Sequence, residues 1–168
     1  KFPYTPTSKQ RELLQLLSDF IFNQDKQSLF LLKGYAGTGK TTTISIVVNN
    51  LWLASKKAVL LAPTGRAAKV IAGYSNKKAF TIHKKIYFPK KQTGGGFQFV
   101  LAPNKHRNTV FIADEASMIP DTPADSKLFE NGWRLVDLMF YVYSGQNCKL
   151  ILIGDTAQLP PVKLELSP

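Results

Sequence analysis

Residues 34–41 read Gly-Tyr-Ala-Gly-Thr-Gly-Lys-Thr, which is the pattern G-x-x-x-x-G-K-[ST] of a phosphate-binding P-loop. The apolar run 29–32 before the loop predicts a buried strand, and apolar residues at near-helical spacing after it predict a helix. A glycine-rich turn between a strand and a helix directs backbone N–H groups at an anion. The alternative is a glycine-rich turn that binds nothing, but strand, spacing and helix all agree with a nucleotide site.

The residues of this loop have separate roles in binding a nucleotide. Gly34, Gly37 and Gly39 lack a Cβ, so the backbone can turn tightly and approach the phosphates closely. Lys40 places a compact positive charge on the β- and γ-phosphates, and the Thr41 hydroxyl ligates Mg²⁺. The expected cofactors are therefore ATP and Mg²⁺.

Alternating strand and helix patterns predict the fold class. Further strands are expected at 58–62, 110–113 and 150–153, and helices at about 8–23, from the P-loop to about 55, from 64, and over much of 124–143. Residues 74–108 read as basic and irregular, with a flexible point at 94–96. This order predicts one α/β domain with a parallel sheet covered by helices on both faces. Ligand groups should gather at the carboxyl ends of the strands.

Charge is spread unevenly along the chain, whose net charge is +11. From Lys26 to Ala113 there are fifteen Lys and Arg and no Asp or Glu. A uniformly basic half indicates a polyanion partner as well as ATP, although a basic surface that only aids solubility is the alternative.

Cysteine content and hydropathy indicate the cellular compartment. The single cysteine, Cys148, lies in an apolar run and predicts a packed thiol in a reducing environment. No apolar run approaches the ~20 residues that span a bilayer, and no signal-peptide pattern opens the sequence. We therefore expect a cytoplasmic protein with no membrane partner.

Two acids follow the strand expected at 110–113. Asp114 would hold Mg²⁺ as a Walker B aspartate, and Glu115 would orient or deprotonate the attacking water as a general base. Two solvated loop acids are the alternative. After the strand at 150–153, Asp155 could help set the Mg²⁺ shell or tie this loop to the DNA side, and Gln158 could hydrogen-bond the γ-phosphate or the water.

Taken in order, five stretches resemble the first motor domain of superfamily 1 helicases, in the RecD-like branch. They are Gly34–Thr42 (motif I), Ala62-Pro63-Thr64-Gly65-Arg66-Ala67-Ala68 (motif Ia), Thr81-Ile82-His83 (motif Ib), Asp114-Glu115-Ala116-Ser117-Met118 (motif II) and Gly154-Asp155-x-x-Gln158-Leu159-Pro160-Pro161-Val162 (motif III). Gln10 lies where such enzymes carry a glutamine that reads the adenine. The resemblance covers nearly the whole chain.

The resemblance implies a RecA-like P-loop ATPase domain over 1–168, with a small inserted subdomain at about 84–108. It implies an ATP-dependent helicase or translocase that moves along single-stranded DNA, 5′-to-3′; RNA is not excluded as the track. The family also needs a second RecA-like domain, C-terminal in the same full-length protein and absent from this chain, so the isolated chain should bind Mg-ATP but hydrolyse it weakly.

Family roles also extend to individual residues. Motif I adds Thr38 and Thr42 to the nucleotide contacts. Motifs Ia and Ib imply DNA contacts from Pro63, Thr64, Gly65, Arg66, Thr81 and His83. Three of the family's functional residues also have a structural alternative. Gln10 can be the N3 residue of a capping box with Thr7, Arg66 can form an ion pair, and His83 can be a structural side chain.

The interval 77–107 carries Lys and Arg with aromatic residues between them, which is typical of single-strand binding. In the family this interval can hold a pin that splits the duplex; the alternative is a basic hairpin with a small core of its own. For the whole chain, the alternative function is a non-motor ATP-binding switch that controls a partner protein. A motor subunit of a helicase–nuclease complex is a narrower variant of the helicase hypothesis.

Overall fold

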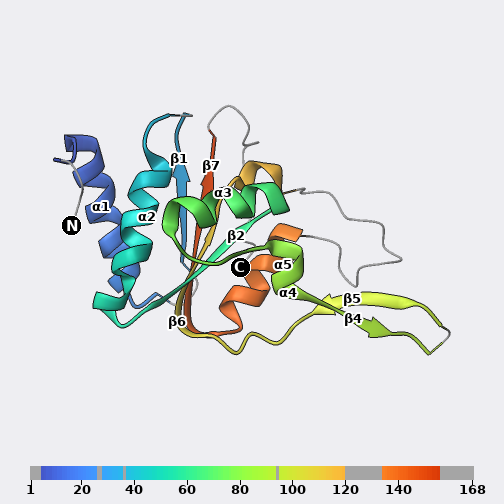
Figure 1. Ribbon diagram of the computed structural model, residues 1–168. Coiled ribbons are helices and arrows are strands. Elements are labelled where there is room, and N and C mark those ends of the chain that lie inside the picture. Colours follow the sequence, from blue (N-terminus) through green and yellow to red (C-terminus); the bar gives the residue numbers. More distant parts are fainter. Residues whose placement is uncertain (1–4, 26–27, 36, 94, 120–133, 156–168) are drawn as a thin grey trace.

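The computed structural model describes residues 5–25, 28–35, 37–93, 95–119 and 134–155 (Figure 1). Its elements, in chain order, are α1 (Ser8–Phe22), β1 (Leu29–Lys33), α2 (Lys40–Asn50), the 3₁₀ helix η1 (Leu51–Ala54), β2 (Lys57–Ala62), α3 (Gly65–Ser75), β3 (Ala79–Thr81), α4 (Ile82–Ile86), β4 (Tyr87–Lys91), β5 (Phe97–Leu101), β6 (Arg107–Ala113), the 3₁₀ helix η2 (Ala116–Met118), α5 (Arg134–Tyr143) and β7 (Gln146–Gly154).

The central sheet has five strands in the order β1-β7-β6-β2-β3. Every neighbouring pair in it is parallel, with Lys33 opposite Gly154 and Ala113 opposite Leu152 in the register. Because all strands run the same way, their carboxyl ends form one edge of the sheet. The predicted parallel sheet is confirmed.

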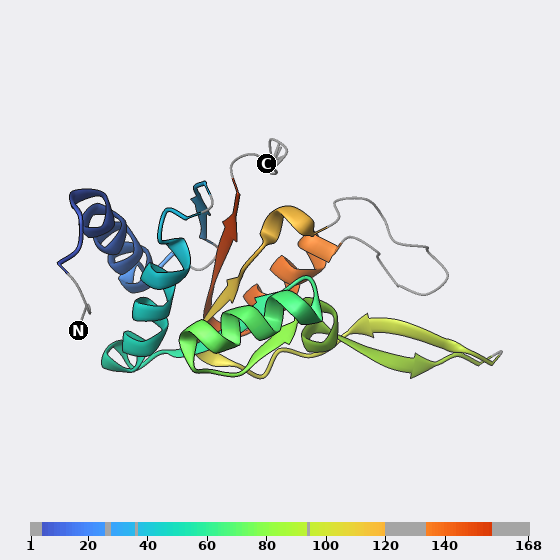
Figure 2. The same cartoon turned by 45° about the horizontal axis from the view of Figure 1, so that its top comes forward.

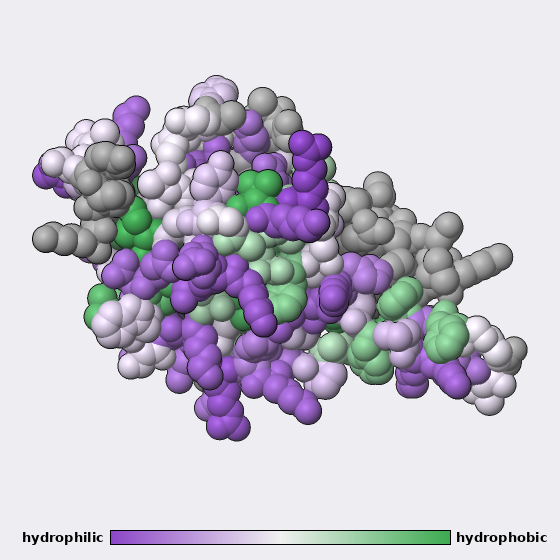
Figure 3. All heavy atoms as spheres, in the orientation of Figure 1, coloured by the Kyte–Doolittle hydropathy of each residue, from purple (hydrophilic) through white to green (hydrophobic). Residues whose placement is uncertain are grey.

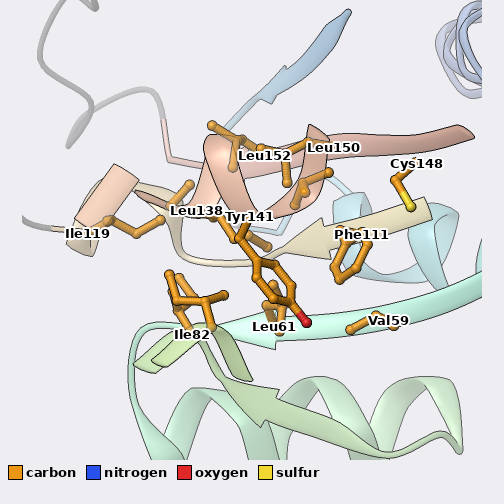
Figure 4. Packing of buried hydrophobic residues seen from close by; sticks show 14 of the residues in the cluster. Val59, Leu61, Ile82, Phe111, Ile119, Leu138, Tyr141, Cys148, Leu150 and Leu152 are labelled. Carbon is orange, nitrogen blue, oxygen red and sulfur yellow. The ribbon is translucent and has the colours of Figure 1, made fainter. Parts of the chain in front are cut away.

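Helices cover both faces of this sheet, because successive residues of each buried strand point to opposite sides. On one face, Phe111, Leu150 and Leu152 pack with Leu138 and Tyr141 of α5 (Figure 4). The opposite face is formed by the intervening residues, which pack against α1, α2 and α3: Leu60, Val110, Ile112, Ile151 and Ile153 with Leu17, Ile21, Ile44, Val48 and Ile71. Within the described residues, no helix is long and apolar enough to cross a membrane.

The prediction that 74–108 is irregular is wrong. The segment contains β3, α4 and an antiparallel hairpin, in which Tyr87 of β4 pairs with Leu101 of β5. β3 has only three residues, too few for a periodic pattern, and Lys90 and Lys91 interrupt the apolar alternation of β4. The hairpin projects away from the parallel sheet (Figure 2), so most of its pairing is local.

Several boundaries also differ from the predicted ones. The helix after the P-loop ends at Asn50, and η1 completes the segment before Ser55 turns the chain with φ 52°. β6 and β7 begin several residues earlier than predicted, at Arg107 and Gln146, because their polar first residues extend the ladder outside the core. Of the helix expected over 124–143, the part up to 133 lies outside the described residues.

Candidate functional site

The P-loop connects β1 to α2 at the carboxyl edge of the sheet. Gly37 and Gly39 have φ of 78° and 81°, in the left-handed region that favours glycine, and Gly39 is the N-cap of α2. At Gly34 the constraint is space, since a Cβ would lie 3.2 Å from Thr38 Oγ1 and 3.3 Å from Lys40 Cδ. The loop therefore presents backbone and the start of a helix to one cavity, as anion binding requires.

Side chains of the loop are held by its own carbonyl groups. The Lys40 Nζ donates to the backbone oxygens of Gly34 and of Tyr35, the latter at 2.7 Å. The Thr38 hydroxyl donates to the same Tyr35 oxygen at 2.8 Å. The ammonium thus lies folded against the loop, beside the cavity, where anionic oxygens can take over its donors.

Asp114 follows β6 and extends the sheet, because its N–H donates to the Leu61 oxygen at 3.0 Å. Burial raises the pKa of its carboxyl group, while the Glu115 N–H and the charge of Lys40 act in the opposite direction. The Glu115 N–H donates to Asp114 Oδ1 at 2.9 Å. A partly buried carboxylate of this kind is stabilised by a nearby cation.

Glu115 has an unusual backbone conformation, with φ 53° and ψ 39° at the N-cap of η2. A left-handed glutamate is sterically disfavoured, so the surrounding structure must hold it there. Its side chain is exposed and lines the same cavity as Lys40. Both acids of the pair thus line the cavity, with Asp114 the more buried of the two.

Gln10 forms the capping box that was its alternative interpretation, and its side chain also lies beside the P-loop. The capping box is formed: Thr7 N–H donates to Gln10 Oε1 at 3.0 Å, and Gln10 N–H donates to Thr7 Oγ1 at 3.2 Å. At the same time its Nε2 lies 3.2 Å from the position of a Cβ on Gly39. The amide therefore caps α1 while touching the P-loop.

A cavity of about 520 Å³ collects the predicted nucleotide residues. It is lined by Gly37, Thr38, Gly39, Lys40, Thr41, Thr42, Val70, Tyr74, Asp114, Glu115, Gly154 and Asp155. Gly34 and Gln10 are adjacent to these residues but do not line the cavity, and Gln158 lies outside the described residues. The predicted residues from β1, β6 and β7 thus meet at one edge.

The donors at this cavity fit Mg²⁺ bound with a nucleotide. Thr41 and Asp114 offer oxygen atoms at its wall, and Mg²⁺ is typically held by one or two protein oxygens together with phosphate and water. Across the described part of the chain, no group of three or more His, Cys, Asp or Glu gathers as a metal site. Few protein ligands are expected at a Mg²⁺ site whose other ligands are nucleotide phosphates and water.

The sequence interpretation missed Val70 and Tyr74, which line the cavity from α3. They are 50% and 67% exposed, although both are large and apolar. A signal was present, because the two residues are four apart on the helix and lie off the buried stripe of Ala68 and Ile71. Their position at the cavity depends on how α3 packs beside α2.

A second cavity, of about 290 Å³, brings together some of the predicted DNA contacts. Pro63 and Thr64 from the end of β2 line it with His83, and Ile82, Tyr87, Met118 and Ile119 complete the wall. Met118 is 52% exposed and directly follows the Asp114–Glu115 segment through η2. The structure thus links motifs Ia, Ib and II on one surface.

The remaining predicted DNA contacts lie near this cavity without lining it. Gly65 and Arg66 are exposed in the first turn of α3, whose N-cap Thr64 accepts from the Ala67 N–H at 3.2 Å. Thr81 likewise caps α4, accepting from the Lys84 N–H at 3.3 Å. Two helix N-termini therefore begin at motifs Ia and Ib, with their hydroxyl groups engaged in capping.

His83 also makes the structural contacts of its alternative interpretation. Its ring centroid lies 4.7 Å from that of Phe99 and 5.3 Å from that of Tyr87. Of the interval's other aromatic residues, Phe88 and Phe97 are 41% and 56% exposed. The aromatics thus divide into a packed group at the base of the hairpin and exposed rings along it.

The basic residues in the described part of the chain are spread over both edges of the sheet and the hairpin. Lys40 and Arg66 lie at the carboxyl edge, and Lys90 and Lys91 lie on the exposed part of the hairpin. In contrast, Lys57 and Arg107 begin β2 and β6, and so lie at the opposite edge of the sheet. Hydrophilic side chains accordingly spread over α3 and down to that edge, while the hairpin is mixed (Figure 3). Only some of these positive charges could contact a nucleic-acid strand bound at the carboxyl edge of the sheet.

Comparison with known proteins agrees with these geometries. A family model described as "AAA domain" matches residues 20–164. The ATP-dependent RecD2 DNA helicase of Deinococcus radiodurans is 32% identical over 136 residues, covering 80% of this chain and 16% of that protein. The ATP-dependent DNA helicase dda of Enterobacteria phage T4 is 31% identical over 143 residues, covering 83% of this chain and 30% of that protein. The helicase resemblance predicted from the motifs is confirmed.

Among solved structures, the ATPase domain of the large terminase of Thermus phage P74-26 aligns with a TM-score of 0.45 and 16% identity, over 91% of this chain and 66% of that one. The chain spans less than a third of the length of the two helicases it matches.

Proposed function

This chain belongs to the AAA domain family, and we propose that it is the ATP-hydrolysing motor domain of a DNA helicase. The observation that carries the proposal is the 520 Å³ cavity, where P-loop residues, two acids and Asp155 from separate strands meet at the carboxyl edge. Two relatives named as ATP-dependent DNA helicases support the same function.

In the proposed reaction, water attacks the γ-phosphorus in line with the bond to the β–γ bridging oxygen; that bond breaks, ADP leaves, and inorganic phosphate is formed. The start of α2 and the Lys40 ammonium bind the β- and γ-phosphates, and Gln10 contacts the adenine. Glu115 holds the attacking water and takes its proton, and Gln158 positions the same water. Mg²⁺, held through Thr41 and Asp114, neutralises phosphate charge when bound.

Single-stranded DNA is the proposed track. The surface formed by Pro63, Thr64 and His83, with Arg66 beside it, offers two helix N-termini and a cation to a phosphate backbone. Such contacts do not reject a 2′-hydroxyl, so RNA is a track that must be tested. Travel in the 5′-to-3′ direction is proposed from the RecD-like resemblance.

The remaining parts of the motor are proposed from the same resemblance. A second RecA-like domain of the full-length protein would close over the cavity and supply an arginine, an interaction worth about 10³–10⁵ in turnover in other P-loop enzymes. The isolated chain should therefore bind ATP but hydrolyse it slowly. The hairpin, within the inserted subdomain at about 84–108, would separate the strands of the duplex.

Strand separation by the full-length protein tests this function. Partial duplexes with only a 5′ or only a 3′ single-stranded tail are incubated with ATP, and the released strand is measured. We expect release from the 5′-tailed substrate. ATP binding without release from either substrate would favour the switch that controls a partner protein.

A further inference from the structure

We propose that Tyr87 is a positioning residue that fixes the β4–β5 hairpin to α5 through its hydrogen bond with Asp137. The Tyr87 hydroxyl donates to Asp137 Oδ2 at 2.6 Å, across fifty positions of sequence. This inference rests on the proposed function, in which the hairpin separates strands.

Tyr87 and Asp137 are both buried, so the hydrogen bond between them can fix how the hairpin is oriented relative to α5. Tyr87 is the first residue of β4 and only 8% exposed, and Asp137 is 1% exposed in the first turn of α5. A hydrogen bond to a carboxylate in a buried site is short and strong, and its loss leaves a buried polar atom without that partner. The helix N-terminus also favours a negative charge at Asp137. The base of the hairpin is thus held at a defined point.

The other end of the hairpin is fastened to the same helix. Asn104, three residues after β5, donates from Nδ2 to the backbone oxygens of Tyr141 at 2.8 Å and Val142 at 3.1 Å. Its Oδ1 accepts from the His106 N–H at 2.9 Å, which fixes the amide in that orientation. The entering and leaving strands are therefore attached to the first and last turns of α5, and the Asn104 contacts also occupy two carbonyls at that helix's end.

α5 in turn leads directly to the nucleotide cavity. It is followed by β7, which pairs with β1 and ends with Gly154 opposite Lys33, at the start of the P-loop. Gly154 and Asp155 line the cavity. A hairpin fastened to α5 consequently keeps a fixed orientation to the sheet edge where ATP and the track are proposed to bind.

The experiment compares Tyr87→Phe with Tyr143→Phe in the full-length protein. Tyr143 is the matched control: it is a half-buried phenol at the C-terminal end of α5, and its hydroxyl donates to the Ser28 oxygen at 3.0 Å, away from the hairpin. Burial raises the pKa of Tyr143 to about 12, so its hydroxyl stays protonated in ordinary assays. Each variant removes one oxygen and keeps the ring.

Two readouts are taken, and thermal unfolding is recorded for both variants. The first is the number of base pairs separated per ATP hydrolysed. For Tyr87→Phe we expect this ratio to fall about tenfold, the scale expected when a hydrogen bond to a charged group is lost. For Tyr143→Phe we expect the wild-type ratio.

The second is a spin-label distance between cysteines introduced at Thr93, near the hairpin tip, and at exposed Asn49 on α2. Its distribution should broaden only in Tyr87→Phe. Asp137→Asn, which keeps an acceptor oxygen, should retain most of the wild-type ratio.

An unchanged ratio in Tyr87→Phe overturns the proposal, whether or not the distances broaden. An equal fall in Tyr143→Phe also overturns it, because the effect would then be loss of stability. If instead the wild-type protein hydrolyses ATP without regard to DNA, the proposed function fails, and the spin-label distances still test the anchor alone.

Discussion

The side-chain nitrogen of Gln10 lies 3.2 Å from where a Cβ on Gly39 would be, and its side-chain oxygen accepts from the N–H of Thr7, the N-cap of α1. One amide thus caps a helix and touches the N-cap of the P-loop helix. The two roles can be separated by substitution, because glutamate also serves at the N3 position of a capping box.

We predict that Gln10→Glu keeps stability while weakening ATP binding. The carboxylate can still accept from Thr7, but it brings negative charge toward the phosphate loop. Gln10→Ala should lose about 0.5–1.5 kcal/mol of unfolding free energy as well as ATP affinity. Urea denaturation and titration with a fluorescent ATP analogue measure the two effects. Wild-type ATP affinity in Gln10→Glu would show that Gln10 is a cap alone.

Asp114→Asn should stabilise the protein while reducing turnover. Burial raises the pKa of Asp114 above its ordinary value near 3.8, so folding favours the protonated carboxyl group. The stability this group contributes is present below that ordinary value and is lost as the pH rises through the raised folded pKa. At pH 7 without nucleotide, the asparagine variant should therefore unfold about 1–4 °C higher. The difference should shrink below about pH 4.

The measurement is thermal unfolding from pH 3 to pH 8, with ATP turnover at neutral pH in parallel. Turnover should fall at least about a hundredfold, because a carboxylate oxygen is lost from the cavity wall. A lower midpoint for the variant at pH 7 would contradict the assigned burial of Asp114.

Gly145 and Gly73 should respond to alanine in opposite ways. A Cβ on Gly145 would lie 2.5 Å from Asn104 Nδ2 and 2.7 Å from Cys148 Sγ, both held in packed positions, whereas nothing lies within 4 Å of a Cβ on Gly73. We predict that Gly145→Ala destabilises by about 1–3 kcal/mol. Gly73→Ala, inside α3, should stabilise by about 0.5–1 kcal/mol. Denaturant titration of both variants decides, and equal effects would refute the packing described around Asn104.

Arg66 and Lys57 carry the same charge, so Lys57 can serve as the control when Arg66 is tested for binding to the DNA track. Both are exposed, but Arg66 lies beside the carboxyl edge and Lys57 begins β2 at the opposite edge. Arg66→Ala should weaken single-strand binding several-fold and reduce the slope of log K against log salt by about 0.7. Lys57→Ala should change neither. Fluorescence anisotropy across a salt series is the assay; equal losses would mean that the whole basic surface binds without a defined track.

That the predicted residues line one cavity could be foreseen because their pattern is local in sequence. The P-loop pattern specifies Lys40 and Thr41 within eight residues, and Asp114 was identified by its place at the end of an apolar strand. Their meeting in one cavity follows from the parallel sheet, since parallel strands bring their carboxyl ends together.

The parts that escaped prediction depend on tertiary packing. Tyr74 reaches the cavity only because α3 crosses beside α2, and β3 is defined by pairing with β2 and has only three residues. The Tyr87–Asp137 bond joins residues fifty positions apart. No pattern of composition or period reports such a contact.

The function proposed for this site is that of the ATPase centre of a DNA motor. The most direct measurement is steady-state ATP hydrolysis by the full-length protein, with and without single-stranded DNA, beside Lys40→Ala. We expect turnover that rises at least about tenfold with DNA and is lost in the variant. Turnover that is indifferent to DNA, or that survives Lys40→Ala, would contradict it.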